Sequence, residues 1–119
     1  MYSELIKEHF QNPRCTEPLT KYTHYNSLSN VTCNDRVEFF LNLEAKDSGF
    51  LVHGVHIKVL GCGLSIAAAS ILASQIIIKN YITRDFLTAD VFLSGLRPYP
   101  AGKEACIIVA LDCLLGAIK

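Results

Sequence analysis

The sequence predicts an α+β domain, in which a small antiparallel sheet of about three strands packs against helices. Two apolar segments with strand-like alternation follow one another at residues 36–44 and 50–60. The longer helical patterns come after these strands and none lies between them, so the βαβ alternation of a parallel sheet is missing. A chain of 119 residues has the length of one domain, and we expect residues 1–119 to form a single domain.

The composition favours a compact fold and argues against several classes of partner. Hydrophobic residues make up 50% of the chain and charged residues 18%, which is enough apolar material for a core. Eleven basic and eleven acidic side chains balance, so we expect neither nucleic acid nor a membrane surface as a partner. Residues 1–8 include two acidic side chains and no sustained apolar stretch. This differs from a secretory signal, and we expect a cytoplasmic protein.

The first element is a short N-terminal helix. Residues 3–10 carry apolar side chains at helical spacing, and the helix is expected to end at Asn12 because Pro13 follows. Residues 11–30 are rich in Pro, Thr, Asn and Ser and have no clear period. We interpret them as loop, with Tyr22 and Tyr25 as candidates for a short edge strand.

The central part of the chain predicts a β-hairpin. Apolar and polar side chains alternate strictly over residues 36–44, as in a half-buried strand. A turn is expected at residues 46–49, and residues 50–60 continue the same period. His53 and His56 are three residues apart, so we expect them on opposite faces of the second strand, where they cannot bind one metal ion together.

Residues 59–78 form an uncharged run that is long enough to cross a bilayer. Glycines on both sides of Cys62, three serines and a glutamine interrupt this run, so we predict a buried helix from Gly63 to Lys79. Asn80 is its expected C-cap, because asparagine tolerates the left-handed conformation that ends many helices.

Two further helices are expected near the C-terminus. Thr83 has the residue type of an N-cap and predicts a helix that runs to about Leu93. The dipeptide Ser94-Gly95 is expected to close it. A final helix is predicted over residues 104–118, after a loop that contains Pro98 and Pro100.

The five cysteines are the candidates for chemistry. In a reducing compartment, cysteines are more often metal ligands, reactive groups or small buried side chains than halves of disulfides. Cys33 and Asp35 are two residues apart, so a thiolate and a carboxylate can point the same way. Cys62 and Cys106 each stand at the start of a predicted helix, where the helix dipole stabilises a thiolate. The alternative for each cysteine is simple packing in the core.

The other two cysteines are interpreted as bystanders. Cys113 lies two helical turns beyond Cys106, about 10 Å along the axis, which is too far for both to bind one zinc ion. We assign it to packing. Cys15 stands in a loop between prolines and has no ligand-like neighbour in the sequence.

In order and spacing, these motifs resemble the IscU/NifU-N-terminal (SufU-related) family of iron-sulfur cluster assembly scaffolds over nearly the whole chain. Residues 2–4, leading to residues 9–14, look like the family's opening helix and its Asn-Pro-Arg, and residues 32–35 look like its Cys-Gly-Asp. Residues 61–67 look like its Gly-Cys-Gly-x-x-Ile-Ala, and Cys106 stands at its third cysteine. The spacing from Cys62 to Cys106 lacks the insertion typical of SufU. The resemblance implies a SufE/NifU-like fold.

The resemblance also implies a function. A scaffold of this family, which is not an enzyme in the ordinary sense, builds a transient [2Fe-2S] cluster from iron and the sulfur of a cysteine desulfurase and transfers it to apo iron-sulfur proteins. The implied ligands are Cys33, Asp35, Cys62 and Cys106, and Cys106 is also the implied sulfur acceptor. Three thiolates and one oxygen donor hold a cluster or Zn(II) less tightly than four thiolates, which suits release.

Three departures from the family pattern keep two alternatives open. Asn34 replaces a glycine, and Ala105 stands where IscU proteins carry a histidine and SufU proteins a basic residue. The segment that the Hsp70-type chaperone recognises keeps here only Pro100 and Lys103, which argues against that partner. The first alternative is a SufU-like persulfide carrier that contains zinc. The second is a structural zinc module without transfer activity.

Overall fold

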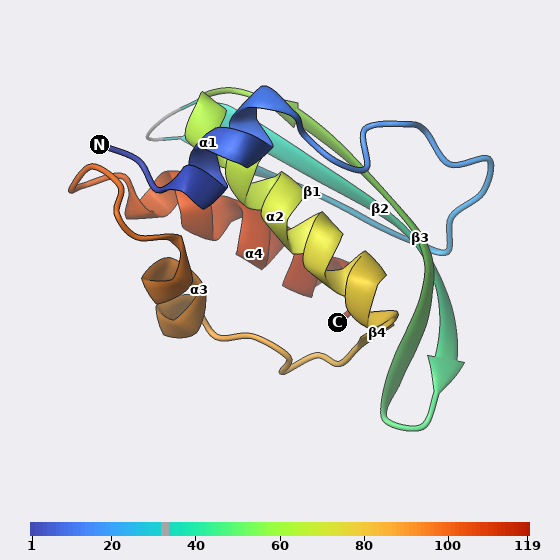
Figure 1. Cartoon of the computed structure of the whole chain (residues 1–119). Coiled ribbons are helices and arrows are strands. Elements are labelled where there is room, and N and C mark those ends of the chain that lie inside the picture. The colour runs from blue at the N-terminus through green and yellow to red at the C-terminus, as the bar shows by residue number, and fades with distance from the viewer. Residues whose placement is uncertain (32–33) are drawn as a thin grey trace.

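In the computed structural model, which describes residues 1–31 and 34–119, helices cover one face of a curled antiparallel sheet (Figure 1). The elements in chain order are α1 (Glu4–Gln11), β1 (His24–Asn30), β2 (Asp35–Lys46), β3 (Gly49–Leu60), α2 (Gly63–Lys79), β4 (Tyr81–Ile82), α3 (Ala89–Leu96) and α4 (Glu104–Ala117). The strand order is β1-β2-β3-β4, and each neighbouring pair is antiparallel. The predicted α+β class is confirmed.

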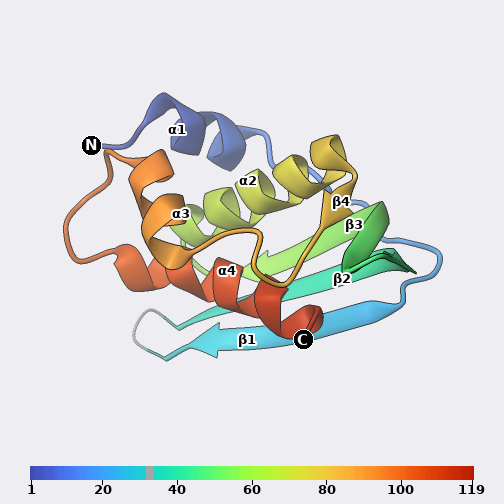
Figure 2. The same ribbon diagram turned by 90° about the horizontal axis from the view of Figure 1, so that it is seen from below.

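The helices form two layers on the sheet. Helices α2 and α4 pack directly against it, α1 packs on α2, and α3 packs on α4 (Figure 2). The core lies between the sheet and these helices. On the sheet side it contains Val37, Phe39 and Leu41, which alternate with more exposed residues along β2 as the sequence pattern predicts.

The long uncharged run is a buried helix, as predicted. Helix α2 begins at Gly63 and ends at Lys79, and Asn80 is its C-cap in the left-handed conformation, with a φ of 62°. Its Ala and Leu side chains, with Ile71 and Ile76, are buried on several sides because the sheet, α1 and α4 all contact it, whereas Ile77 and Ile78 near its end are exposed. None of the helices that the structure describes has the length and hydropathy needed to cross a membrane.

The sheet has one strand more than predicted. The candidate edge strand is present as β1, which contains Tyr25 but not Tyr22. The additional strand is β4, where the chain turns at Asn80 and pairs Tyr81 with Leu51 of β3. A strand of two residues is too short to show a period in the sequence.

The prediction for α3 is wrong at both ends. The helix begins at Ala89 rather than near Thr83, and it continues through Ser94 and Gly95 to Leu96. The hydroxyl of Thr83 donates to the Asp85 carboxylate at 2.9 Å and so belongs to a local turn. Thr88 is the real N-cap, because its Oγ1 accepts from the Val91 N–H at 3.3 Å.

The prediction for the two strand histidines is also wrong. A β-bulge shifts the register, so that Asn42 pairs with Gly54 whereas Leu43 pairs with Val52. The extra residue interrupts the alternation of β3, and Val52 and Val55 are both buried although they are three residues apart.

The bulge places both histidines on the outer face of the sheet. Nε2 of His53 lies 2.8 Å from the Glu44 carboxylate. The ring of His56 packs on Phe40, with the ring centroids 5.1 Å apart. Glu44 and Phe40 alternate along β2 with the buried side chains of the core. The two histidines thus have separate partners on one face.

Candidate metal centre

Three of the predicted ligand residues meet at one end of the sheet. Asp35 is the first residue of β2, Cys62 is the N-cap of α2, and Cys106 lies in the first turn of α4. Figure 2 shows the starts of both helices at the end of the sheet where β2 begins. One ligand atom from each residue lies within 4.8 Å of the other two. These distances suit ligands of one metal ion or of one small cluster.

The carboxylate of Asp35 is held by hydrogen bonds from the start of α2. Its side chain is only 1% exposed. Oδ1 accepts from the Cys62 backbone N–H at 2.8 Å, and Oδ2 lies 3.6 Å from Cys62 Sγ. A buried carboxylate needs such donors to remain charged. Asp35 therefore has a fixed orientation toward the two cysteines.

Ser65 is a site residue that the sequence reasoning missed. Its buried Oγ lies 2.8 Å from Asp35 Oδ2 and 2.9 Å from the backbone carbonyl oxygen of Cys106, so these two acceptors share its single proton. Its Oγ also lies 3.6 Å from Cys62 Sγ. The signal was its position three residues after the N-cap, where a side chain faces back toward the cap.

Gly61 allows the backbone to approach this carboxylate. Its φ of +150° is a conformation that side chains rarely adopt, and a Cβ atom there would collide with Asp35 Oδ1. The glycine before the metal-ligand candidate Cys62 is thus required by the close contact with Asp35.

The two described cysteines of the site differ in access. Cys62 is exposed, whereas Cys106 has no exposed surface. The backbone of Cys106 is held on both sides, by its own N–H to the Lys103 carbonyl oxygen at 3.1 Å and by Ser65 at its carbonyl oxygen. Cys33, the fourth predicted ligand, lies outside the described residues. Asn34 has a φ of 57°, the left-handed conformation that asparagine tolerates.

Neither of the other cysteines joins this group within the described part of the chain. Cys113 is buried as predicted for a packing residue, and its Sγ lies 3.3 Å from the carbonyl oxygens of Asn26 and Val37. Burial raises the pKa of Cys113 to about 12. Cys15 is half-buried in its loop, where burial also raises its pKa.

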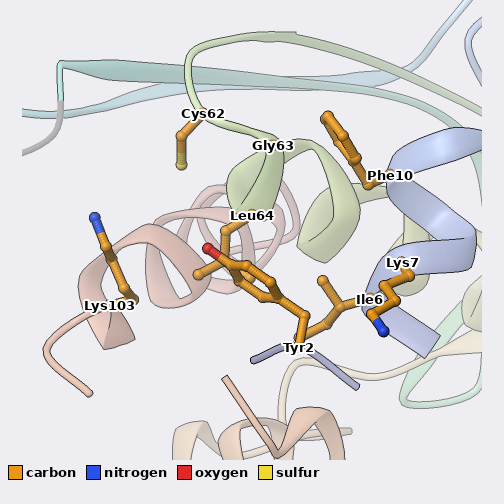
Figure 3. A pocket seen from close by; sticks show the side chains of 8 residues that line it. All are labelled: Tyr2, Ile6, Lys7, Phe10, Cys62, Gly63, Leu64 and Lys103. Carbon is orange, nitrogen blue, oxygen red and sulfur yellow. The ribbon is translucent and has the colours of Figure 1, made fainter. Parts of the chain in front are cut away.

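A pocket of about 260 Å³ opens beside Cys62 (Figure 3). It lies between α1, the start of α2 and the residue before α4. Most of its lining is apolar, and two lysines stand among the lining residues. These residues are Tyr2, Ile6, Lys7, Phe10, Cys62, Gly63, Leu64 and Lys103.

Sequence comparisons find a family model and curated proteins that are similar to this chain. The model of the family "NifU-like N terminal domain" matches residues 1–119. The chain is 26% identical over 118 residues to the iron-sulfur cluster assembly scaffold protein IscU 1 of Archaeoglobus fulgidus, a match that covers 99% of this chain and 74% of that protein. It is 28% identical, with the same coverage, to the IscU scaffold protein of Aquifex aeolicus.

Solved structures share the fold. The SufU protein of Fervidobacterium islandicum AW-1 matches with a TM-score of 0.72 and 16% identity, over 99% of this chain and 96% of that chain. The N-terminal part of a NifU-like protein from Brucella abortus matches with a TM-score of 0.72 and 19% identity, over 98% of this chain and 90% of that chain.

Proposed function

The chain belongs to the NifU-like N-terminal domain family, and on this premise we propose that it is an iron-sulfur cluster assembly scaffold. Its substrates are iron and sulfur, its product is a transient [2Fe-2S] cluster, and the acceptors are apo iron-sulfur proteins. The scaffold proteins IscU of A. fulgidus and A. aeolicus support this proposal, since they align with almost the whole chain.

The observation that carries the proposal is the convergence of Asp35, Cys62 and Cys106, whose ligand atoms lie within 4.8 Å of one another. These residues occupy three of the four positions that the family resemblance implies as ligands, and Cys33 is proposed as the fourth. Thiolates suit iron, and the carboxylate is a harder and weaker donor for a cluster.

The hydrogen bonds of Asp35 suit a site that must release its cargo. When the cluster leaves, the carboxylate keeps the Cys62 N–H and the Ser65 hydroxyl as donors. The empty site therefore contains no unsatisfied buried charge from Asp35, which would otherwise make release costly. A site whose carboxylate is hydrogen-bonded both with and without the cluster can bind the cluster and release it.

The sulfur is proposed to come from a cysteine desulfurase, with Cys106 as the residue from which sulfur enters the cluster. In this step a sulfur atom is transferred, as in a sulfurtransferase reaction, but the protein is not proposed to turn over a substrate as an enzyme does. Zn(II) is the proposed metal of the resting form, because cysteine thiolates and carboxylate oxygens are both ligands that this ion takes in proteins.

Anaerobic reconstitution with ferrous iron, L-cysteine and a cysteine desulfurase tests the proposal. We expect the visible absorbance of a [2Fe-2S] cluster and its decay when an apo-ferredoxin is added. The variant Cys62→Ser is expected to lose this absorbance, whereas the matched control Cys15→Ser keeps it, because Cys15 is remote from the site. If the wild type gives no cluster, with either this sulfur source or inorganic sulfide, the scaffold function is wrong.

One feature favours a second candidate, a zinc-containing persulfide carrier. Residue 105 is alanine, and its exposed methyl group offers no ligand next to Cys106. A carrier needs only a zinc site and one sulfur acceptor. In the same experiment it would give one tightly bound zinc ion and a persulfide on Cys106 without cluster absorbance. Bound zinc without either product would indicate a structural zinc module.

A further inference from the structure

The two described cysteines of the site stand in opposite environments, and this difference bears on the path of sulfur. Cys62 is exposed at the mouth of the pocket, whereas Cys106 is 0% exposed. A persulfide on another protein must bring its terminal sulfur into contact with the accepting thiol. Cys106 offers no exposed surface for this contact, and hydrogen bonds from its backbone to Ser65 and to the Lys103 carbonyl oxygen fix its place in the first turn of α4.

We propose that sulfur enters this protein at Cys62, from a donor segment that occupies the pocket of Figure 3, and reaches Cys106 by a second transfer. This inference rests on the proposed function, because it concerns the sulfur that the scaffold receives. It names Cys62 as a relay residue in addition to its role as a ligand.

The pocket has the shape and charge for a particular kind of donor segment. Ile6, Phe10 and Leu64 supply an apolar lining, and Figure 3 shows their side chains around the same pocket as Cys62. Among residues 1–31 and 34–119, no carboxylate lies within 4.0 Å of the Lys103 ammonium group, and Lys7 has only Glu4 at 3.8 Å. The occupant that fits is an apolar segment of the sulfur donor that carries an acidic side chain and the anionic persulfide.

The first transfer needs only the thiol of Cys62 and the persulfide of the donor. The Cys62 sulfur lies 3.6 Å from Asp35 Oδ2, and its thiol proton is the one that the donor cysteine takes up at the end of the step. The Cys62 sulfur attacks the terminal sulfur of the donor persulfide. A new S–S bond forms, the S–S bond of the donor breaks, and the donor cysteine leaves as a thiolate that takes up a proton. No external oxidant or reductant is needed.

The second transfer moves the same sulfur atom inward. The Cys106 sulfur attacks the terminal sulfur of the Cys62 persulfide, and Cys62 leaves as a thiolate. The proton of Cys106 goes to Cys62, so thiols and persulfides are conserved in number. The distance within the ligand group, at most 4.8 Å, allows this step with a small movement. Cys62 is then free to bind metal.

Labelling with ³⁵S tests this order. The protein is mixed with a cysteine desulfurase and ³⁵S-labelled L-cysteine, quenched at short times with an alkylating reagent, and mapped by peptide. In wild type we expect label at Cys62 before Cys106. In Cys106→Ser the label should accumulate at Cys62, and in Cys62→Ser the label at Cys106 should fall about tenfold or more. Labelling of Cys106 in Cys62→Ser at the wild-type rate would overturn the inference.

A second variant pair tests the pocket without changing a thiol. Lys103→Glu should slow the labelling of Cys62 about tenfold, because complementary charge speeds association by at least this factor. Lys58→Glu is the matched control, since Lys58 is an exposed lysine of β3 and the change in net charge is the same. Equal rates for the two variants would overturn the docking of a donor segment. Circular dichroism of each variant confirms that it is folded.

The outcomes separate this inference from the proposed function. If wild type assembles a cluster from iron and inorganic sulfide while Cys62→Ser still takes label at Cys106, only the route through Cys62 is wrong. If wild type neither takes label nor assembles a cluster, both the route and the scaffold function fail. If free cysteine persulfide labels Cys62 as fast as the desulfurase does, the protein donor is wrong although the entry residue is right.

Discussion

Ser65 shows how a single hydroxyl group organises the site. It contacts the Asp35 carboxylate, the backbone of Cys106 and the sulfur of Cys62, and these three residues come from three different elements. Its removal leaves a buried carboxylate and a buried carbonyl with one donor fewer. Such a loss is costly because water cannot replace the donor in a closed site.

We therefore expect Ser65→Ala to lower the free energy of unfolding by about 1–3 kcal/mol. Its affinity for Zn(II) should fall about 10- to 100-fold, as is usual when a group that orients metal ligands is removed. Urea unfolding and a competitive zinc titration measure the two effects.

Ser74→Ala is the matched control for this prediction. Ser74 lies on the same helix, only partly buried, and its replacement should change the free energy of unfolding by less than about 0.5 kcal/mol. If both variants are equally stable and bind zinc equally well, the organising role of Ser65 is wrong.

His9 is a second buried polar residue, on the face of α1 that packs against α2. It is 6% exposed, and its Nδ1 lies 2.7 Å from the Ser70 hydroxyl, which also accepts from the Arg14 N–H at 2.8 Å. Burial, with the nearby charge of Arg14, lowers the pKa of His9, and Glu8 opposes this in part. The folded protein therefore prefers the neutral imidazole.

This preference predicts a loss of stability in acid. When the pH falls through the ordinary histidine pKa of about 6.5, the unfolded chain takes up a proton that folded His9 does not, so the free energy of unfolding decreases. One proton gives a slope of at most about 1.4 kcal/mol per pH unit. Urea unfolding from pH 7.5 to 5 should show that the stability advantage of wild type over His9→Gln shrinks toward acid. A pH-independent difference would contradict the shift.

At the scale of elements, helix ends differ in how well the local sequence predicts them. Helix α2 was predictable at both ends because its signals are local: a glycine-flanked cysteine before it, and Asn80 after it. Helix α3 was not, because Thr83 and Thr88 are both good caps and only the Thr83 contact with Asp85 shows that the first forms a turn. The bulge near His53 likewise depends on pairing with β2, which no local pattern records.

The same contrast applies to the site. Cys62 and Cys106 were candidates because each stands at a helix start, where the helix dipole stabilises a thiolate, and Asp35 because it can point the same way as Cys33. Their place in one ligand set came from the resemblance to the IscU/NifU-N-terminal family. Ser65 was not identified, although it stands three residues after the N-cap, because this position alone does not distinguish a serine that faces the core from one that faces a ligand. Its role depends on the arrival of α4, which is distant in the sequence.

Two glycines, Gly61 between β3 and α2 and Gly95 within α3, give a matched test. Gly61→Ala should destabilise the protein by more than about 1 kcal/mol and prevent zinc binding, because the new Cβ collides with Asp35 and the φ of +150° becomes strained. Gly95→Ala should stabilise it by about 0.5–1 kcal/mol, because Gly95 lies inside α3 with open space at its Cβ position. Thermal unfolding and zinc titration of both variants test this, and an equal effect of the two substitutions would contradict it.

At the scale of the whole molecule, the ligand group joins the sheet to both inner helices. Asp35 belongs to β2, Cys62 to α2 and Cys106 to α4, and these elements pack against one another. A metal ion bound to all three would therefore link the main layers of the fold. Binding that is confined to the folded state adds its free energy to the stability of the entire unit.

We expect Zn(II) at about 100 times its dissociation constant to stabilise the protein by about 2.7 kcal/mol, which corresponds to a rise in Tm on the order of 10 °C. Differential scanning calorimetry with and without zinc measures this rise. Cys106→Ser should show a much smaller rise, whereas Cys15→Ser should match the wild type. A rise that is equal in all three proteins would place the zinc elsewhere.

The distribution of the ligands along the chain has a consequence for biosynthesis. Asp35, Cys62 and Cys106 emerge from the ribosome one after another, and the third belongs to α4, the last of the described elements. Domains fold as units during translation, so a nascent chain that lacks α4 has only part of the site. A growing polypeptide therefore cannot capture the metal in its final geometry. Loading of the complete site must follow the synthesis and folding of α4, because a truncated product that ends before α4 lacks Cys106.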